Sequence, residues 1–393
     1  MSEPAVNHIA ILGASGSIGR QALEICRLHS GSLRVGALTA GANWRALADA
    51  VREFRPRMAV IVEPEAYAPL KAACGDCATK LYAGAEYLPQ AAADSGADML
   101  LAAISGSAGL PSLVAALEAG IDVALANKEA LVAAGALVKR LCAEHGSRLY
   151  AVDSEHSALQ QCLRGEERQA VRRLILTASG GAFRELSYEQ LAAVKPEEAL
   201  HNPNWQMGAK VTVDSATMVN KGLELIEASW LFDIEPARIS ALLHPQSIVH
   251  SLVEYVDGSV KAQLSQPDMR LPIQYALLRG QRRPSPLQAL DLEQLGRLDF
   301  QPIDRRKYPA VELFRQAAQR GGAAAAYLNA ANEQLVKLFL AGLIGFTDIS
   351  DILTQLADGY RPLPANSLEQ ILSADAQARM MVKTLVKKAE VIC

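Results

Sequence analysis

Short apolar runs alternate with longer amphipathic stretches over the first 150 residues. Each apolar run is bounded by Gly, Pro or polar residues, which is typical of a strand buried on both faces. The stretches between the runs repeat apolar residues at helical spacing. Strand and helix in alternation predict a parallel sheet covered by helices, a Rossmann-like domain over residues 1–150. The predicted strands are residues 8–12, 33–38, 58–62, 99–104 and 121–126, and the predicted helices are 20–29, 44–54, 64–73, 111–119 and 128–145.

The pattern changes after residue 150. Further apolar runs at 171–176, 239–243, 248–256 and 260–264 predict strands, and Asp257-Gly258 between the last two is a typical hairpin turn. This part is therefore α+β, whereas the periodicity from residue 310 onward is helical. The predicted fold class is α/β. It comprises an N-terminal Rossmann-like parallel sheet (1–150), a central α+β catalytic domain (151–285), a linker (286–309) and a C-terminal helical domain (310–393).

A glycine-rich turn joins the first predicted strand to the first predicted helix. Its spacing is Gly-x-x-Gly-x-x-Gly rather than the commoner Gly-x-Gly-x-x-Gly. Because this spacing alone is a weak signal, the prediction rests on the position of the turn between a strand and a helix. Glycines let the backbone approach a pyrophosphate, and the helix N-terminus favours the negative charge. The sequence thus predicts a dinucleotide site that includes Gly13, Ala14, Ser15, Gly16, Ser17 and Ile18.

The segment after the second predicted strand indicates which dinucleotide binds. An NAD site usually places Asp or Glu there to bind the ribose. Residues 39–45, which include Gly41 and Asn43, contain no carboxylate and end at Arg45, so they favour NADPH. Asn127, Lys128 and Glu129 follow a later strand at the same edge of the sheet, where ligands bind. Lys128 stands at a helix start, a poor place for a structural cation, so it is predicted to face the ligands, with an ordinary surface lysine as the alternative.

Two acidic segments offer ligands for a cation. Asp153 and Glu155 follow the strand predicted at 149–152, and Glu224 ends the segment 214–224. Two carboxylates so close in an apolar setting repel each other unless a cation neutralises them. Oxygen ligands suit a hard ion, Mg²⁺ or Mn²⁺.

The second acidic segment is predicted to be a helix that begins near Ser215, a good N-cap residue. Asn220, Lys221 and Glu224 then share one face, with Thr217 one turn earlier. A hydroxyl, an amide, an ammonium and a carboxylate on one face suit a phosphate held beside a metal. A solvated surface helix can carry the same residues, so both interpretations stay open here.

Two loops complete the candidate site. The small-residue turn 177–183, which contains Ser179, is suited to binding an oxyanion through backbone N–H groups. The polar segment 196–208, which carries Trp205 and Met207, is predicted to be a lid over the substrate. The alternative for Trp205 is a side chain anchored in the core.

Composition excludes several classes of protein. The chain is 50% hydrophobic and 21% charged with a net charge of −3, and its aromatic content is 5%, which argues against nucleic-acid binding. Ser105, Gly106, Gly109 and Pro111 interrupt the longest uncharged stretch, so no membrane span is expected. No export signal is visible, which predicts a cytoplasmic protein with reduced cysteines.

Several of these stretches together resemble the 1-deoxy-D-xylulose 5-phosphate reductoisomerase family over essentially the whole chain. The resemblance implies a homodimer that uses NADPH and Mg²⁺ or Mn²⁺ in non-mevalonate isoprenoid precursor biosynthesis. It implies rearrangement of a sugar phosphate, 1-deoxy-D-xylulose 5-phosphate, and reduction to 2-C-methyl-D-erythritol 4-phosphate. The matching stretches are 13–19, 126–129, 152–156, 178–183, 203–208, 213–224 and 244–247.

The resemblance also implies residue roles. Asp153, Glu155 and Glu224 would bind the metal and, with Lys128, form the catalytic set. The cofactor set gains Asn127, Lys128, Glu129 and Gly208. Asn202 stands where the family usually has His, and its amide can donate a hydrogen bond but carries no charge. The implied substrate-binding residues are Ser154, Ser179, Asn202, Trp205, Met207, Ser215, Asn220, Lys221 and His250.

Two other functions remain to be weighed. A semialdehyde or homoserine dehydrogenase also joins a nucleotide domain to an α+β domain, but the former needs a nucleophilic Cys at a helix start. Cys162 lies inside the helical stretch that follows Glu155, which does not suit that role. A non-catalytic nucleotide sensor would have no use for three carboxylates beside a phosphate site.

Overall fold

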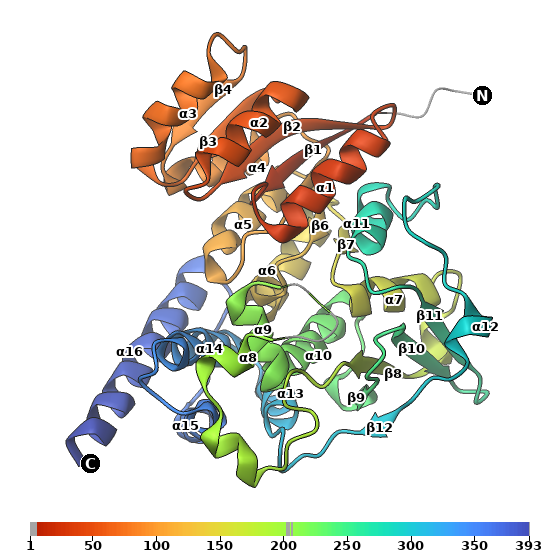
Figure 1. Ribbon diagram of the computed structural model, residues 1–393, viewed down its shortest axis with the longest axis vertical. Helices are drawn as coiled ribbons and strands as arrows, with labels where there is room; N and C mark the ends of the chain where they lie inside the picture. Colours follow the sequence, from red (N-terminus) through yellow and green to blue (C-terminus); the bar gives the residue numbers. More distant parts are fainter. Residues whose placement is uncertain (1–5, 202–204, 206, 393) are drawn as a thin grey trace. The chain divides into compact units, whose positions relative to one another are not determined.

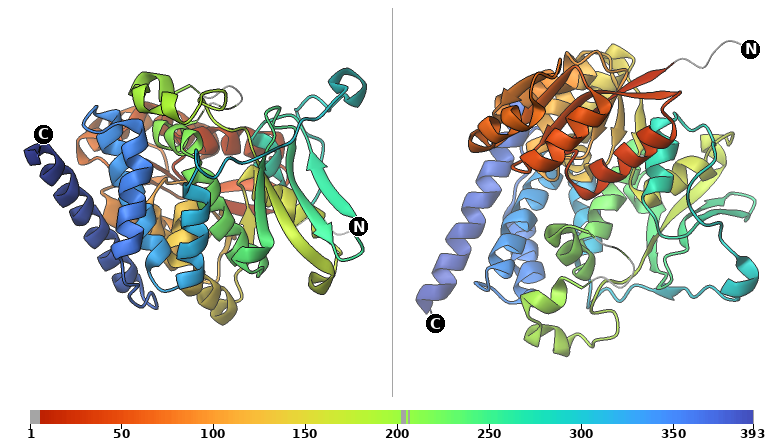
Figure 2. Two further views of the ribbon diagram at one scale, coloured as in Figure 1. Left: turned by 90° about the horizontal axis from the view of Figure 1, so that it is seen from below. Right: turned by 45° about the horizontal axis from the view of Figure 1, so that its top comes forward.

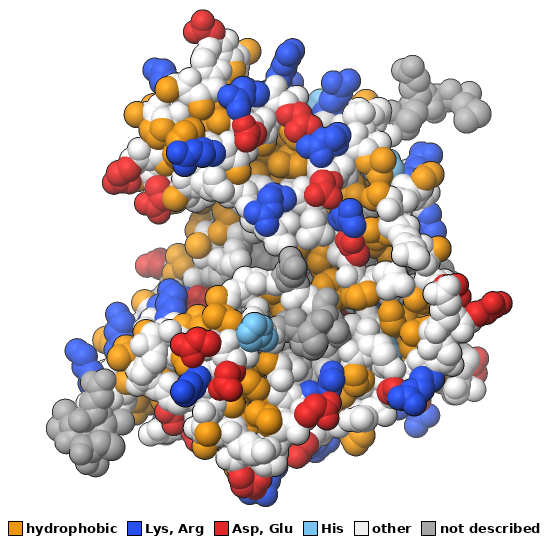
Figure 3. Space-filling model, viewed as in Figure 1, with side chains coloured by type: hydrophobic (Ala, Val, Ile, Leu, Met, Phe, Trp, Pro, Cys, Tyr) orange, Lys and Arg blue, Asp and Glu red, His pale blue; other side chains and the backbone are white. Residues whose placement is uncertain are grey.

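The computed structural model describes residues 6–201, 205 and 207–392. The chain divides into two compact units. The first comprises the described parts of Met1–Ala130, Val138–Ser157 and Asp268–Leu287, and the second those of Leu131–Leu137, Ala158–Pro267 and Gln288–Cys393. On the face drawn in Figure 3, acidic and basic side chains are interspersed over each unit. No helix among the described residues has both the length and the apolar character needed to cross a membrane.

The first unit is built on a seven-stranded sheet in the order β4-β3-β2-β1-β5-β6-β7. Every neighbouring pair is parallel, which confirms the predicted Rossmann-like sheet. The strand order reverses between β1 and β5, the place where ligands bind in open parallel sheets. The strands are β1 (Asn7–Leu12), β2 (Leu33–Ala40), β3 (Met58–Ile61), β4 (Lys80–Ala83), β5 (Met99–Ala102), β6 (Asp122–Leu125) and β7 (Leu149–Ala151).

Helices cover this sheet. Crossovers between parallel strands are right-handed, so helices on either side of the reversal lie on opposite faces of the sheet. Figure 1 shows α1, α2 and α3 on the near face. The helices are α1 (Ser17–Leu28), α2 (Trp44–Phe54), η1 (Pro64–Ala66), α3 (Tyr67–Cys74), η2 (Ala85–Tyr87), α4 (Leu88–Ala93), η3 (Ser107–Gly109), α5 (Leu110–Glu118), α6 (Lys128–His145) and α11 (Arg270–Leu277).

The second unit contains a five-stranded sheet in the order β11-β10-β8-β9-β12. Only the β8–β9 pair is parallel, so the sheet is mixed, as expected for an α+β region. The predicted hairpin joins β10 to β11, with Gly258 at φ +86°. The strands are β8 (Val171–Ala178), β9 (Ile239–Leu243), β10 (Val249–Tyr255), β11 (Val260–Leu264) and β12 (Gln301–Pro302).

In the second unit α9, α10, α13, α15 and α16 pack around α14, which is buried along most of its length. Figure 2 shows α13, α14, α15 and α16 side by side. Gly222 on α10 allows close packing, because a Cβ there would lie 2.9 Å from the Phe314 side chain of α13. The helices of the second unit are α7 (Ser154–Cys162), whose first turn belongs to the first unit, η4 (Arg168–Ala170), η5 (Glu189–Ala193), α8 (Pro196–Ala199), α9 (Ala209–Ala216), α10 (Val219–Phe232), η6 (Pro236–Arg238), α12 (Leu292–Leu295), α13 (Ala310–Arg320), α14 (Ala324–Leu340), α15 (Phe346–Gly359) and α16 (Leu368–Ile392).

Candidate active site

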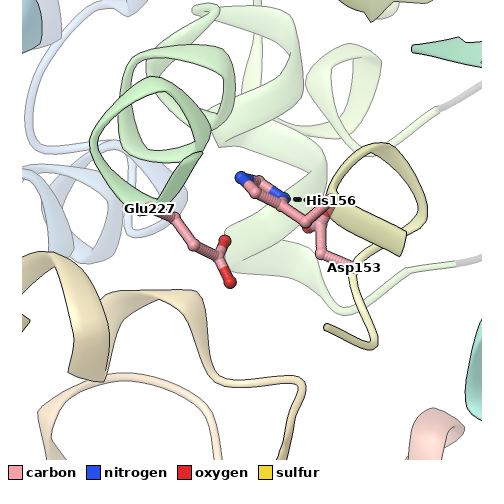
Figure 4. Close-up of side chains that lie close together, drawn as sticks. All are labelled: Asp153, His156 and Glu227. Carbon is pink, nitrogen blue, oxygen red and sulfur yellow. Dashed lines mark hydrogen bonds and ion pairs between the residues drawn. The ribbon is translucent and has the colours of Figure 1, made fainter. Parts of the chain in front are cut away.

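Asp153 lies between β7 and α7, where a parallel strand ends. Lys128 Nζ donates to its Oδ2 at 2.5 Å. His156 Nδ1 lies 3.1 Å from Asp153 Oδ1, a contact that Figure 4 marks with a dashed line. Burial alone would raise the pKa of Asp153, but the Lys128 ammonium and the His156 ring outweigh it and hold the pKa well below its usual range. Asp153 is therefore an ionised, nearly buried carboxylate at neutral pH.

Lys128 opens α6, a place where a cation opposes the helix dipole. The preceding Asn127 caps this helix, because its Oδ1 accepts a hydrogen bond from Ala130 N at 3.1 Å. Asn127 Nδ2 also donates to Gly106 O at 2.8 Å and so joins two strand-end loops. The Asp153 carboxylate compensates the unfavourable position of Lys128. Lys128 is thus tied to the loop after β7 and Asn127 to the loop after β5.

Ser154 and Glu155 form the first turn of α7. Ser154 Oγ donates to Glu155 Oε2 at 2.5 Å, and Asp153 Oδ1 accepts from Glu155 N at 3.3 Å. These bonds orient Glu155 beside Asp153. The first unit thus holds two of the three predicted metal ligands, one on either side of Ser154, just after β7.

The third predicted ligand belongs to the second unit. Glu224 on α10 is 1% exposed, accepts a hydrogen bond from Asn220 Nδ2 at 2.5 Å and pairs with Lys221 Nζ. The predicted shared face of Asn220, Lys221 and Glu224 is thereby confirmed. Glu227, one turn further along α10, is completely buried and was not singled out from the sequence.

The predicted start of this helix near Ser215 is wrong. Ser215 lies inside α9, and α10 begins only after Met218, whose φ of +61° breaks the helical path. Thr217 does not join the shared face, because its hydroxyl donates back to Val213 O at 3.2 Å and Asp214 O at 3.3 Å. Such back-bonding satisfies carbonyls at the end of α9 and favours the break.

Ser179 and Ser215 belong to two segments in direct contact. Gly181, at φ +67°, lies so close to α9 that a Cβ there would be 2.7 Å from Ser215 O. Lys307 Nζ supports the same turn by donating to the carbonyls of Phe183 at 2.8 Å and Leu186 at 2.5 Å. Sequence reasoning missed Lys307, since it stands in the predicted linker without any motif.

His250 lies on β10 and is 5% exposed, with its Nε2 2.9 Å from Ser265 Oγ. The half-buried Trp205 lies beside it, with ring centroids 6.2 Å apart. Met207 is also half-buried, whereas Asn202 lies outside the described residues. The nearby His244 is structural, because its Nε2 accepts hydrogen bonds from Ile248 N and Val249 N.

The glycine-rich turn has the close contacts that a dinucleotide site requires. A Cβ at Gly13 would lie 2.8 Å from Ala103 O, and one at Gly19 would lie 2.3 Å from Gly13 O. The first turn of α1, starting at Ser17, therefore packs tightly over the end of β1. Further along the predicted cofactor site, Asn43 caps α2 by accepting from Ala46 N at 3.1 Å. The Arg45 guanidinium stacks on the Trp44 ring at 4.4 Å.

Cys162 does not suit a nucleophile. It lies at the end of α7, and burial raises the pKa of its thiol to about 11. A neutral thiol attacks carbonyl carbons poorly. This geometry argues against the semialdehyde dehydrogenase alternative.

Comparison with known proteins gives consistent matches along the chain. Residues 9–135 match the family model for 1-deoxy-D-xylulose 5-phosphate reductoisomerase, and residues 149–232 and 264–381 match models for C-terminal domains of that enzyme. The 1-deoxy-D-xylulose 5-phosphate reductoisomerase of Zymomonas mobilis is 45% identical over 98% of this chain and 99% of the relative. That of Pseudomonas aeruginosa strain PA14 is 47% identical over 96% of this chain and 97% of the relative.

Solved structures agree. The Zymomonas mobilis reductoisomerase in complex with NADPH superposes with a TM-score of 0.91 at 44% identity, covering 97% of this chain and 99% of that one. A DOX-P reductoisomerase in complex with NADPH, fosmidomycin and magnesium gives a TM-score of 0.93 at 41% identity, covering 98% of this chain and 99% of that one.

Proposed function

The chain belongs to the 1-deoxy-D-xylulose 5-phosphate reductoisomerase family, and from this premise we propose which of its residues carry the reaction. The enzyme rearranges 1-deoxy-D-xylulose 5-phosphate and reduces the product to 2-C-methyl-D-erythritol 4-phosphate. NADPH supplies the hydride, and a divalent metal ion is required. The reaction belongs to isoprenoid precursor biosynthesis.

We assign Asp153, Glu155 and Glu224 to one divalent cation. The donor set fits a hard ion because all its atoms are carboxylate oxygens, and the low pKa of Asp153 keeps that ligand ionised. When bound, such an ion polarises the ketone oxygen and the neighbouring hydroxyl of the substrate. The ammonium of Lys128 would stabilise the oxygen that becomes negative as the carbon–carbon bond breaks.

The phosphate of the substrate is assigned to Ser179, Ser215, Asn220 and Lys221. Two observations support this assignment: the turn that follows Ser179 contacts α9, and Asn220 and Lys221 share the polar face of α10. Hydroxyl, amide and ammonium donors suit a phosphate dianion. Binding energy from this distant group would orient the reacting end of the sugar.

The remaining residues would hold the carbon chain and the cofactor. His250 and Ser154 would orient the sugar hydroxyls, while Trp205 and Met207 would exclude water as parts of a lid. The pyrophosphate would lie on the turn before α1, where glycines permit close approach. The assigned cofactor residues are Gly13, Ala14, Ser15, Gly16, Ser17, Ile18, Gly41, Asn43, Asn127, Lys128, Glu129 and Gly208.

The ionised Asp153 beside Lys128 is the observation that carries the assignment of the metal site, and Glu224→Gln tests it. The variant keeps its shape but loses its charge, so we expect turnover to fall at least about 100-fold with NADPH affinity unchanged. Glu254→Gln is the matched control, because Glu254 is also a buried carboxylate of the second unit but pairs with Arg173. NADPH oxidation across a Mn²⁺ titration measures the effect. Wild-type turnover in chelator-treated, metal-free buffer would refute the metal's role.

We also propose that the enzyme is a cytoplasmic homodimer that accepts Mn²⁺ as well as Mg²⁺. The five described cysteines are free thiols, as in a reducing compartment. β11 forms one edge of the mixed sheet, and the exposed Val256 and Val260 offer an apolar surface to a second copy. A monomer mass by light scattering at micromolar concentration would contradict dimerisation.

A further inference from the structure

Asp214, the residue before Ser215, is a buried carboxylate with two partners. It is 1% exposed, and its Oδ1 accepts a hydrogen bond from Asn332 Nδ2 at 2.7 Å. Lys210 Nζ lies 2.8 Å from its Oδ2. Asp214 stands in the last turn of α9, where the helix dipole disfavours a negative charge. The helix dipole therefore does not account for this carboxylate; its partners are Lys210 on α9 itself and Asn332 on α14.

Asn332 makes one hydrogen bond to α9, through Asp214. It lies on α14 with 0% exposure, and the reverse orientation of its amide would set two oxygens against each other, so Asp214 fixes the orientation. Its Oδ1 is buried with no hydrogen-bond partner in the part of the chain that the structure describes. A buried acceptor without a donor is unfavourable. The bond to Asp214 is thus the side chain's one compensating interaction among the described residues.

α9 needs contacts of this kind to keep its orientation. It has eight residues, its N-cap Gly208 provides no side-chain hydrogen bond, and Met218 separates it from α10. A helix this short is not stable on its own. Within the second unit it lies between the turn at Gly181 and Asn332 on α14.

We propose that Asn332 is a positioning residue for the phosphate-binding end of the substrate site. By holding Asp214 it fixes the rotation of α9 about its axis and hence the direction of the Ser215 hydroxyl. A roll of about 15° would move a hydroxyl about 4 Å from the helix axis by about 1 Å. Misplacement by about 1 Å is enough to weaken binding and turnover. The inference rests on the proposed role of Ser215.

Asn332→Leu tests the proposal, because leucine has a similar volume but cannot donate a hydrogen bond. We expect at least a tenfold rise both in KM for the deoxyxylulose phosphate and in Ki for inorganic phosphate. Kd for NADPH should stay within twofold of wild type. Asn329→Leu is the matched control, since Asn329 is on the same helix, is 1% exposed and bonds to Glu333 rather than to α9. It should leave all three constants within twofold of wild type.

Two further variants separate positioning from folding. Asn332→Gln keeps the amide but displaces it by one methylene, so it can replace the leucine variant if that variant does not fold. It should also raise KM and Ki. Exchange of the partners, Asp214→Asn with Asn332→Asp, restores one donor and one acceptor and should recover most of the phosphate affinity. Unchanged Ki in the leucine and glutamine variants, or an exchange variant no better than Asn332→Asp alone, would overturn the proposal.

Ser215→Ala, measured in parallel, separates the phosphate contact assigned to Ser215 from the positioning role proposed for Asn332. If it raises KM and Ki while Asn332→Leu does not, only the positioning role of Asn332 is overturned. If Ser215→Ala changes neither constant, the assigned phosphate contact of Ser215 fails and the positioning role fails with it.

Discussion

Gly181→Ala should lower both the stability of the second unit and its affinity for the substrate. Gly181 has φ +67°, and a Cβ there would lie 2.6 Å from Ala216 Cα and 2.7 Å from Ser215 O. Both neighbours are backbone atoms, so no side-chain rotation relieves the clash. Reaching ordinary contact at 3.4 Å from 2.6 Å requires a displacement of 0.8 Å between the turn and α9.

The expected magnitude has two parts. A non-glycine residue in the left-handed region costs about 1–2 kcal/mol. Inserting a methyl group into a packed contact adds about 1–3 kcal/mol. Gly165→Ala isolates the first part, because Gly165 has φ +82° but nothing within 4 Å of the added Cβ. Gly181→Ala should therefore be the more destabilising by about 1–3 kcal/mol.

Urea unfolding of both variants at an unchanged m-value measures this difference. KM for the deoxyxylulose phosphate should rise about tenfold in Gly181→Ala alone, because the clash separates Ser179 from Ser215 by nearly 1 Å. Equal midpoints for the two variants would show that the close contact with α9 does not exist in solution. Equal KM values with unequal midpoints would confirm the close packing but refute its effect on phosphate binding.

Two further predictions concern the cofactor and the lid. Since residues 39–45 contain no carboxylate, kcat/KM should be at least about tenfold higher with NADPH than with NADH. Arg45→Ser should reduce this difference between the two cofactors. Equal kcat/KM values in the wild type would contradict the assignment of these residues to NADPH. Trp205→Ala should raise KM and lower kcat with little change in Tm, because Trp205 is half-buried beside His250; a large loss of Tm with normal kinetics would make it a core residue.

The fold was predictable where local pattern and burial agree. The strands of the parallel sheet are continuous apolar runs because helices cover both faces, and all of them except β4 were recognised. β4, at the edge of the sheet, has the sequence Lys-Leu-Tyr-Ala with exposed or half-buried side chains, so it lacks that signal. The break at Met218 was missed because residues 209–232 have helical character throughout, and neither the positive φ of Met218 nor the back-bonding of Thr217 has a sequence signal.

The residues of the candidate site also fall into two groups, those that the sequence pairs and those that only folding brings together. Asp153 and Glu155, or Asn220 and Glu224, are close in sequence, so strand-end position or helical spacing is enough to pair them. Lys307 is different, because its carbonyl partners lie more than 120 residues away and nothing in its own segment indicates them. Gly181 is similar, because it lies in a turn and its neighbour Ser215 belongs to α9.

The two asparagines of α14 show why sequence reasoning stops at this point. Asn329 and Asn332 stand in one alanine-rich run and are equally buried. Asn329 bonds to Glu333 one turn later, a pairing that helical spacing alone predicts. Asn332 bonds to Asp214, which lies 118 residues away, and only the packing of α14 against α9 creates that contact. If Asn332 positions Ser215 as proposed, part of the substrate affinity depends on a helix that carries none of the site's motifs.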